Sequence, residues 1–212
     1  MERIPWTPTI EVESSYGTRQ VDLATRHLMK RRIFLMGEIT SQTANDFLSQ
    51  YLFLEGESDD PITIYVNSTG GEVTAGLVIY DIIRTSKLKI NMICTGMAAS
   101  MAAILMAAGQ EGRRYILPHS KMMIHEPRML SGVGGSATSI KNISESILET
   151  RRITNEILAQ HTGKSMEEID EATAYDNYMN AEQAIEFGLC DKIVDTLSLI
   201  DSFIVEEGSY GR

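Results

Sequence analysis

The side chain best suited to covalent chemistry is Ser100, which stands in the small-residue segment Ala98-Ala99-Ser100-Met101-Ala102. It follows an apolar stretch and Gly96, close to where a helix is expected to begin. Small neighbours allow a nucleophilic serine to stand on a tight strand-to-helix turn, where backbone N–H groups face a developing oxyanion. The literal G-x-S-x-G pattern is absent, and on local sequence alone a serine that caps a buried helix is the simpler interpretation.

A glycine pair, a histidine and an aspartate are the other candidates for chemistry. Gly70-Gly71 follows a predicted strand and permits close approach of a ligand, although a plain turn explains it more simply. His125 ends an apolar strand just before Glu126-Pro127, and α/β sheets place working side chains at such carboxyl ends. Asp176 lies within Tyr175-Asp-Asn-Tyr-Met-Asn180, where an acid can orient an imidazole or merely cap a loop.

Two segments imitate nucleotide-binding motifs. Gly163-Lys164-Ser165 resembles the end of a P-loop, but the first glycine of that motif would fall at Leu158, and a helix rather than a strand precedes it. Gly132-x-Gly134-x-x-Ala137 matches a dinucleotide fingerprint weakly, without a strand leading directly into it. We therefore expect this chain to bind neither ATP nor another cofactor, and the second segment to be a loop.

Short apolar strands that alternate with helical patterns must position these candidates. Residues 1–20 are expected to be irregular, residues 68–71 to form a loop, and Gly96 to end the third strand. The predicted strands are 32–37, 61–67, 90–95, 114–117, 121–124 and 189–194. Helical patterns run to Leu54 after a cap at Thr40 or Ser41, and over 75–84, 98–108 and 137–161. A short helix is expected after the capping box Ser165-x-x-Glu168, and another from its cap at Asn180 to Gly188. Such alternation indicates an α/β fold with buried parallel strands. The helix at 137–161 is long for the sheet and either projects or covers one face.

Composition narrows the class of protein. With 212 residues, 43% of them hydrophobic, and a net charge of −10, the chain suits one globular domain and not a general nucleic-acid or polybasic membrane binder. Cys94 and Cys190 lie in apolar stretches and are expected to be buried free thiols in a reducing compartment. The apolar stretch at 92–108 is shorter than a membrane span needs and is interrupted by polar residues. The first residues lack the pattern of a secretory signal.

Taken together, the motifs resemble those of the Clp protease proteolytic subunits, from about Val21 to Thr196. The specific matches are Tyr65-Val-Asn-Ser-Thr-Gly-Gly71, Gly96-Met-Ala-Ala-Ser-Met101, Met123-Ile-His-Glu-Pro127, His161-Thr-Gly163, Ala181-Glu-x-Ala184, Phe187-Gly-Leu189 and Asp191. The resemblance implies a serine endopeptidase in which Ser100 is the nucleophile, His125 its base and Asp176 the acid that orients the imidazole. It further implies that the backbone N–H groups of Gly71 and Met101 form the oxyanion hole, with no metal or cofactor.

The resemblance also implies an architecture and an assembly. The fold would be crotonase-like, built of repeated ββα units, with a head domain and a projecting handle helix. Residues 1–20 would be an axial segment, 21–196 a single peptidase domain with its handle region at about 127–161, and 197–212 a tail. Two stacked heptameric rings, of this chain alone or mixed with a paralogue, would receive unfolded proteins from a cytoplasmic Clp AAA+ ATPase that uses the ATP. No nucleic acid or membrane is expected as a partner.

Several positions depart from the pattern common in that family. The family commonly has proline at the position of Thr69 and glycine at that of Ala102. It commonly has an Asp–Arg pair at the positions of Ala174-Tyr175, and aromatic residues at those of Thr63 and Thr85. The loop at 128–135 is longer and richer in glycine than usual. We therefore expect a divergent paralogue that assembles weakly or is slow alone and works with a second subunit. An inactive regulatory subunit and a crotonase-type acyl-CoA enzyme are the competing hypotheses.

Overall fold

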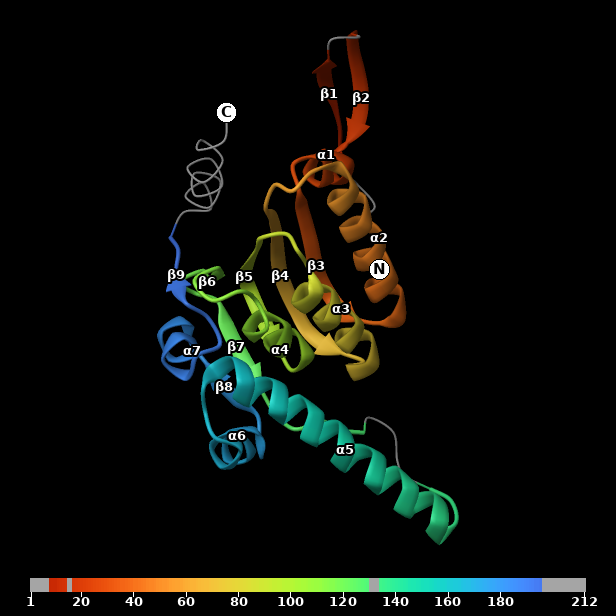
Figure 1. The fold of residues 1–212 in the computed structure, drawn as a ribbon, viewed down its shortest axis with the longest axis vertical. Helices are drawn as coiled ribbons and strands as arrows, with labels where there is room; N and C mark the ends of the chain where they lie inside the picture. The colour runs from red at the N-terminus through yellow and green to blue at the C-terminus, as the bar shows by residue number, and fades with distance from the viewer. Residues whose placement is uncertain (1–7, 15–16, 130–133, 196–212) are drawn as a thin grey trace.

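The computed structural model describes residues 8–14, 17–129 and 134–195 (Figure 1). The strands are β1 (Thr9–Ser14), β2 (Gly17–Asp22), β3 (Arg32–Ile39), β4 (Ile62–Gly71), β5 (Ile90–Ala99), β6 (Arg114–Ile116), β7 (Lys121–Ile124), β8 (Asn177–Met179) and β9 (Lys192–Ile193). The helices are α1 (Leu23–Met29), α2 (Ser41–Glu57), α3 (Val73–Thr85), α4 (Met101–Ala107), α5 (Ala137–Thr162), α6 (Met166–Thr173) and α7 (Ala181–Phe187).

A seven-stranded, mostly parallel sheet forms the centre of the molecule, which confirms the predicted α/β class. Its strands follow the order β3-β4-β5-β6-β9, while β7 pairs with both β5 and β8. Every residue of β4 from Ile62 to Val66 is buried, as expected for a parallel strand that is covered on both faces. The main core joins β3, β4 and β5 to the buried sides of α2, α3 and α4.

Three predicted boundaries were wrong around the central strands. Both β4 and β5 continue through segments that were expected to turn, and β5 ends only at Ala99, so α4 begins at Met101. Gly96 does not end β5 because its missing side chain leaves room for Asn67: a Cβ there would lie 2.8 Å from Asn67 Oδ1. That oxygen accepts the Met97 N–H at 3.0 Å and bridges the shift in register between the two strands.

The expectation of an irregular N-terminal segment was also wrong. Within the described part of residues 1–20, β1 pairs with β2 in an antiparallel hairpin, with Thr9 opposite Asp22 and Ser14 opposite Gly17. The alternation of Ile10 and Val12 with polar residues is a strand pattern that was overlooked. The hairpin stands at the opposite end of the molecule from α5 (Figure 1).

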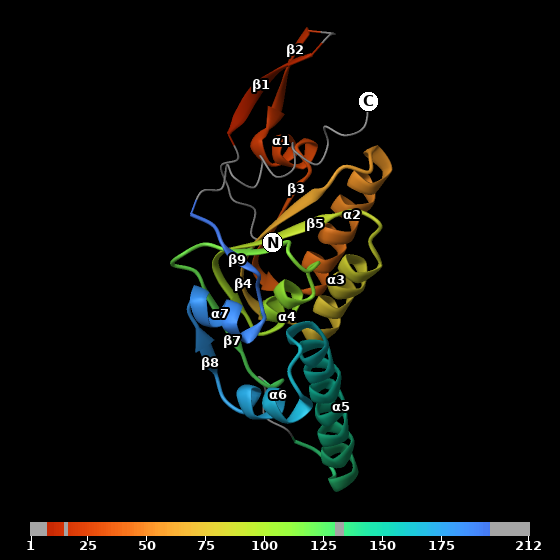
Figure 2. The same ribbon diagram turned by 60° about the vertical axis from the view of Figure 1, so that its left-hand side comes forward.

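The long helix α5 projects from the body of the molecule (Figures 1 and 2). Its buried residues begin only at Thr154, so the first part of the helix has no core to cover. Ser136 caps the helix, and Gly163 ends it in the left-handed conformation at φ 72°. This end explains the P-loop imitation, because Gly163 and Ser165 are the adjoining caps of α5 and α6 rather than a phosphate loop.

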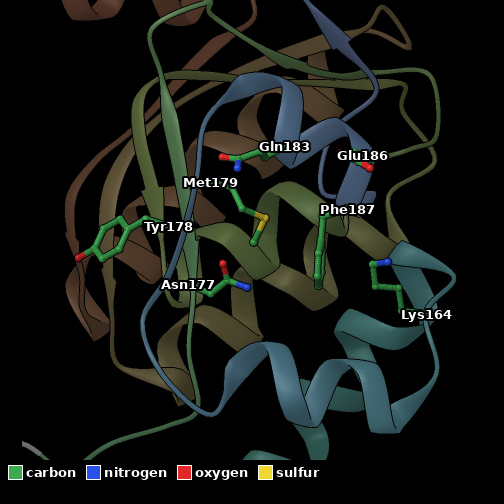
Figure 3. Close-up of a pocket in the computed structure, with 7 residues that line it drawn as sticks. All are labelled: Lys164, Asn177, Tyr178, Met179, Gln183, Glu186 and Phe187. Atoms are coloured by element: carbon green, nitrogen blue, oxygen red, sulfur yellow. The ribbon is translucent and has the colours of Figure 1, made fainter.

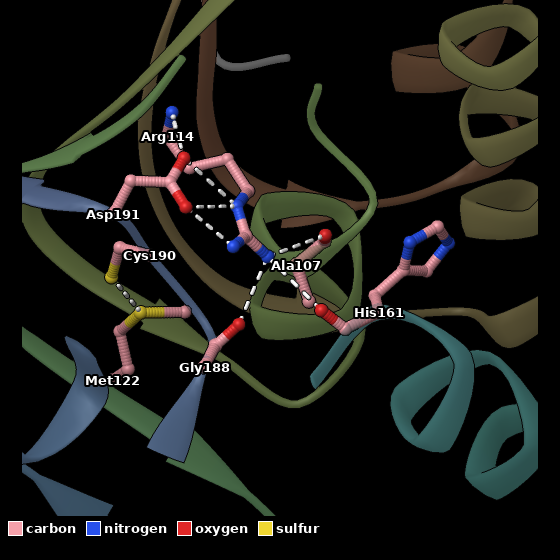
Figure 4. Close-up of polar contacts among 7 residues, drawn as sticks. All are labelled: Ala107, Arg114, Met122, His161, Gly188, Cys190 and Asp191. Atoms are coloured by element: carbon pink, nitrogen blue, oxygen red, sulfur yellow. Dashed lines mark hydrogen bonds and ion pairs between the residues drawn. The ribbon is translucent and has the colours of Figure 1, made fainter. Parts of the chain in front are cut away.

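A buried ion pair lies beside the C-terminal end of α5. Arg114 Nη2 lies 2.5 Å from Asp191 Oδ1 (Figure 4). Its Nη1 donates to the carbonyl oxygens of Ala107, His161 and Gly188, at or near the C-termini of α4, α5 and α7. A cation is favourable there because these ends carry unpaired carbonyl groups and a partial negative charge. One guanidinium therefore holds three helix ends together.

Both cysteines are buried and free, as predicted. Burial raises the pKa of the Cys94 thiol and raises that of Cys190 to about 12, so both stay protonated at neutral pH. Within the described segments, none of the helices combines the length and hydropathy that a bilayer crossing requires. The described residues also contain no group of three or more His, Cys, Asp or Glu side chains arranged around a metal site.

Candidate active site

Ser100 occupies a strained turn between β5 and α4. Its backbone adopts φ 54° and ψ −124°, a conformation that residues other than glycine rarely take. Its side chain makes no capping hydrogen bond to α4, so the alternative of a simple capping serine is not supported. The Ser100 N–H instead donates to the Met123 carbonyl oxygen at 2.8 Å, which fixes the turn against β7.

The structure brings the three predicted triad side chains into one hydrogen-bonded chain. Ser100 Oγ lies 2.9 Å from His125 Nε2, and His125 Nδ1 lies 2.8 Å from Asp176 Oδ1. The tautomer with its proton on Nδ1 satisfies both contacts, because Nδ1 then donates to the carboxylate while Nε2 accepts from the serine. This geometry suits removal of the serine proton by the imidazole.

Pairing of the strands accounts for this juxtaposition. Ala99 of β5 is paired with Met123 of the parallel strand β7, so Ser100 and the end of β7 lie side by side. Ile124 is paired with Asn177 of the antiparallel strand β8, which places His125 beside Asp176. Each of the three residues is therefore the immediate chain neighbour of a paired residue. The short strand β8 was missed in the sequence, where this segment was expected to be a loop.

A cation also contacts the carboxylate of Asp176. Arg128 Nη2 donates to Asp176 Oδ1, the same oxygen that accepts the hydrogen bond from His125 Nδ1. The pKa of Asp176 lies below its ordinary value, mainly because of the hydrogen bond from His125 and also because of the charge of Arg128. Arg128 was not predicted to be a site residue. It lies three positions after His125 in a loop, and neither motif nor periodicity marks it.

Gly70, which precedes the predicted oxyanion residue Gly71, lies against the turn of Ser100. A Cβ on Gly70 would lie 2.7 Å from the Ala99 carbonyl oxygen and 3.0 Å from the Met101 nitrogen, so the end of β4 lies directly against the turn of Ser100. Met101 is the first residue of α4, where a backbone N–H has no partner within the helix. That Gly71 and Met101 donate to an oxyanion stays a prediction.

A network of charges ties the histidine loop to α5 and α6. Arg151 of α5 lies 3.3 Å from a carboxylate oxygen of Glu126 and 3.2 Å from Asp170 of α6. The Glu126 N–H also donates to the Thr173 carbonyl oxygen at 2.8 Å. Because Glu126 follows His125 directly, these contacts fix the segment that carries the imidazole. Sequence reasoning missed Arg151, whose ordinary place in a helix carries no signal.

The positions that depart from the family pattern take ordinary places in the fold. Ala102 is fully buried in α4, and Thr63 is buried in β4 with no hydrogen-bond partner for its hydroxyl group. Ala174 ends α6, and Tyr175 is 83% exposed, so neither contributes a charged group beside Asp176. Of the unusual loop at 128–135, residues 130–133 lie outside the described part of the chain.

A surface pocket of about 290 Å³ lies beside β8 and is separate from the triad (Figure 3). Its lining residues are Lys164, Asn177, Tyr178, Met179, Gln183, Glu186 and Phe187. The Lys164 ammonium lies 4.8 Å from the centre of the Phe187 ring, a cation–π distance. The Lys164 ammonium also lies 3.9 Å from a carboxylate oxygen of Glu168, so the cation already has partners within the chain, and we assign no chemistry to the pocket.

Comparison with known protein families gives one match. The family model described as Clp protease matches residues 15–197 of the 212. The matched region contains the whole seven-stranded sheet, the helices α1 to α7 and the three residues predicted to form the triad.

Proposed function

This chain belongs to the Clp protease family and is therefore a peptidase, and we propose that it is the proteolytic subunit, a serine endopeptidase with Ser100, His125 and Asp176 as its triad. The observation that carries the proposal is the unbroken chain of hydrogen bonds from Ser100 Oγ through His125 to Asp176. Support also comes from the conformation of Ser100, which is strained in the manner of a nucleophile turn.

Each residue has a defined part in the proposed reaction. Ser100 Oγ attacks the carbonyl carbon of the scissile peptide bond while His125 Nε2 accepts the hydroxyl proton. The Asp176 carboxylate holds the imidazole in place and stabilises its charged form. Gly71 and Met101 donate their N–H groups to the oxyanion, and His125 then returns the proton to the leaving amine. A water molecule hydrolyses the acyl-enzyme by the same steps in reverse.

The proposed reaction uses no metal or cofactor in this chain, since side chains and backbone groups supply every role. ATP would be used by a Clp AAA+ ATPase that unfolds the substrate protein. We place the protein in the cytoplasm, and its two buried free thiols agree with a reducing compartment.

We further propose that residues 21–196 form one peptidase domain that assembles into two stacked heptameric rings, of one kind or with a paralogue. Support for assembly through α5 comes from its projection and from the exposed apolar side chains Ile140 and Leu148. Confinement within such a chamber would supply the selectivity that an open serine triad lacks.

Labelling with a fluorophosphonate, read by intact mass, tests the proposal. We expect a single adduct on the wild-type chain and none on Ser100→Ala, since losing the nucleophile removes most of the roughly 10⁶-fold contribution of a serine triad. Peptide hydrolysis should disappear in the same variant. A folded wild-type chain that gives no adduct, alone or mixed with a paralogous subunit, would contradict the proposal and favour a regulatory subunit.

A further inference from the structure

The contact between Arg128 and Asp176 is an unassigned feature of the site. Both side chains lie in segments outside helices and strands, Arg128 after β7 and Asp176 before β8. Their side chains are 49% and 39% exposed, whereas His125 is only 17% exposed. The acid of this triad is therefore accessible to water.

An exposed carboxylate needs more than one partner to keep a single orientation. A side chain held by one hydrogen bond in water exchanges readily among rotamers, and a second, charge-assisted bond restricts it. Among the described residues, His125 and Arg128 both contact Oδ1 of the Asp176 carboxylate. The triad is aligned while both donors are in place, so the second donor is compatible with the reactive arrangement.

We propose that Arg128 is a positioning residue for the triad: its guanidinium fixes the Asp176 carboxylate, which in turn keeps the proton of His125 on Nδ1. This inference rests on the proposed serine peptidase function. In this proposal Arg128 acts through its contact with Asp176 and not on the reacting atoms. The neighbouring Ala174 and Tyr175 bring no charge to the carboxylate, so the support comes from the loop after β7 within the same chain.

The first experiment measures the rate at which a fluorophosphonate modifies Ser100 in the assembled protein. We expect Arg128→Ala to slow modification by about two- to fivefold, the factor that an exposed ion pair supplies, and Arg128→Lys to recover part of the rate. Arg152→Ala is the matched control, because it removes an exposed arginine of α5 that pairs with Glu149 and Glu156, away from the site. Arg152→Ala should be labelled at the rate of the wild type. The midpoints of thermal unfolding should agree among the wild type and all three variants.

The second experiment reads the imidazole directly. The chain has four histidines, so nitrogen-15 histidine spectra are simple, and the His125 signals are those that vanish in His125→Gln. We expect the population with the proton on Nδ1 to fall in Arg128→Ala and to recover in Arg128→Lys.

The outcomes separate the two proposals. The positioning role would be overturned if wild type and Arg128→Ala had equal labelling rates and equal tautomer populations. It would also be overturned if Arg128→Ala were labelled faster than the wild type, since the arginine would then slow the reaction. The role would be overturned as well if Arg152→Ala slowed labelling as much as Arg128→Ala does, or if Arg128→Lys recovered none of the labelling rate. If the wild type is not labelled at all, the peptidase function fails, and the tautomer populations alone decide the role of Arg128.

Discussion

Replacing Gly70 by alanine tests whether the end of β4 positions the nucleophile. Gly70 adopts φ +89°, and left-handed backbone costs other residues about 1–2 kcal/mol. An alanine Cβ would also lie 2.7 Å from the Ala99 carbonyl oxygen and 2.8 Å from Ser100 Cβ. These atoms belong to the backbone and to the base of a side chain, so they cannot rotate away, and overpacking of this kind costs about 1–3 kcal/mol more. We expect Gly70→Ala to lose about 2–5 kcal/mol of unfolding free energy in total.

Gly112 offers a matched control for the free-energy cost of the left-handed backbone conformation alone, without a steric clash. It adopts φ +79° in an exposed turn, and a Cβ there would meet nothing within 4 Å. Gly112→Ala should therefore lose only about 1–2 kcal/mol, and it should leave the turn of Ser100 intact.

Urea unfolding followed by circular dichroism measures the difference between the two variants, and fluorophosphonate labelling measures its effect on Ser100. We expect Gly70→Ala to lose about 1–3 kcal/mol more than Gly112→Ala, or to keep that stability by shifting the turn and losing reactivity. If both variants lose the same free energy and both are labelled at the wild-type rate, then the end of β4 does not position Ser100, and the reasoning fails.

Three further predictions concern Asp191, His161 and Arg151. Asp191→Ala should lower the free energy of unfolding, measured with urea, by about 3–5 kcal/mol, because it leaves the buried Arg114 cation without its carboxylate partner. A loss below about 1 kcal/mol would show that the ion pair does not stabilise the fold. Burial, with the charges of Arg84 and Arg114, lowers the pKa of His161 to about 4, so the folded state binds fewer protons than the unfolded one. Stability should fall as the pH drops from about 6.5 to 4, and His161→Gln should lessen that fall. Arg151→Gln should slow labelling of Ser100 by about two- to fivefold at nearly unchanged stability, and an unchanged rate would show that the network does not reach His125.

Local chemistry made much of the fold predictable. Helix caps were predicted at Thr40 or Ser41, at Ser165 and at Asn180. In the structure Thr40, Ser165 and Asn180 each accept a backbone N–H at the start of α2, α6 and α7. A cap and the apolar run that follows it lie within a few residues, so one stretch of sequence contains the whole signal. The ends of β4 and β5 were mispredicted because their course depends on the fit of Gly96 against Asn67, two residues that are far apart in the chain.

Arg128 marks a second limit of the sequence. Its partner Asp176 lies 48 positions away, and both side chains stand in exposed segments without periodicity. An arginine in a loop is ordinary in a soluble protein, and nothing local distinguishes one that contacts a catalytic acid. Only the three-dimensional arrangement reveals the contact.

The alignment of the triad itself follows from the register of two strand pairs. Residue types and order suggested Ser100, His125 and Asp176, but a hydrogen-bonded triad also requires that β7 be paired correctly with both β5 and β8. A shift of one residue in β8 would turn its side chains to the opposite face and move Asp176 away from the imidazole. With only three residues, β8 can specify its register only weakly by its own pairing. The contacts around it, from the Glu126 N–H to the Thr173 carbonyl oxygen and from Arg128 to Asp176, must therefore secure the alignment. It follows that substitutions in these flanking segments should affect reactivity more than they affect stability.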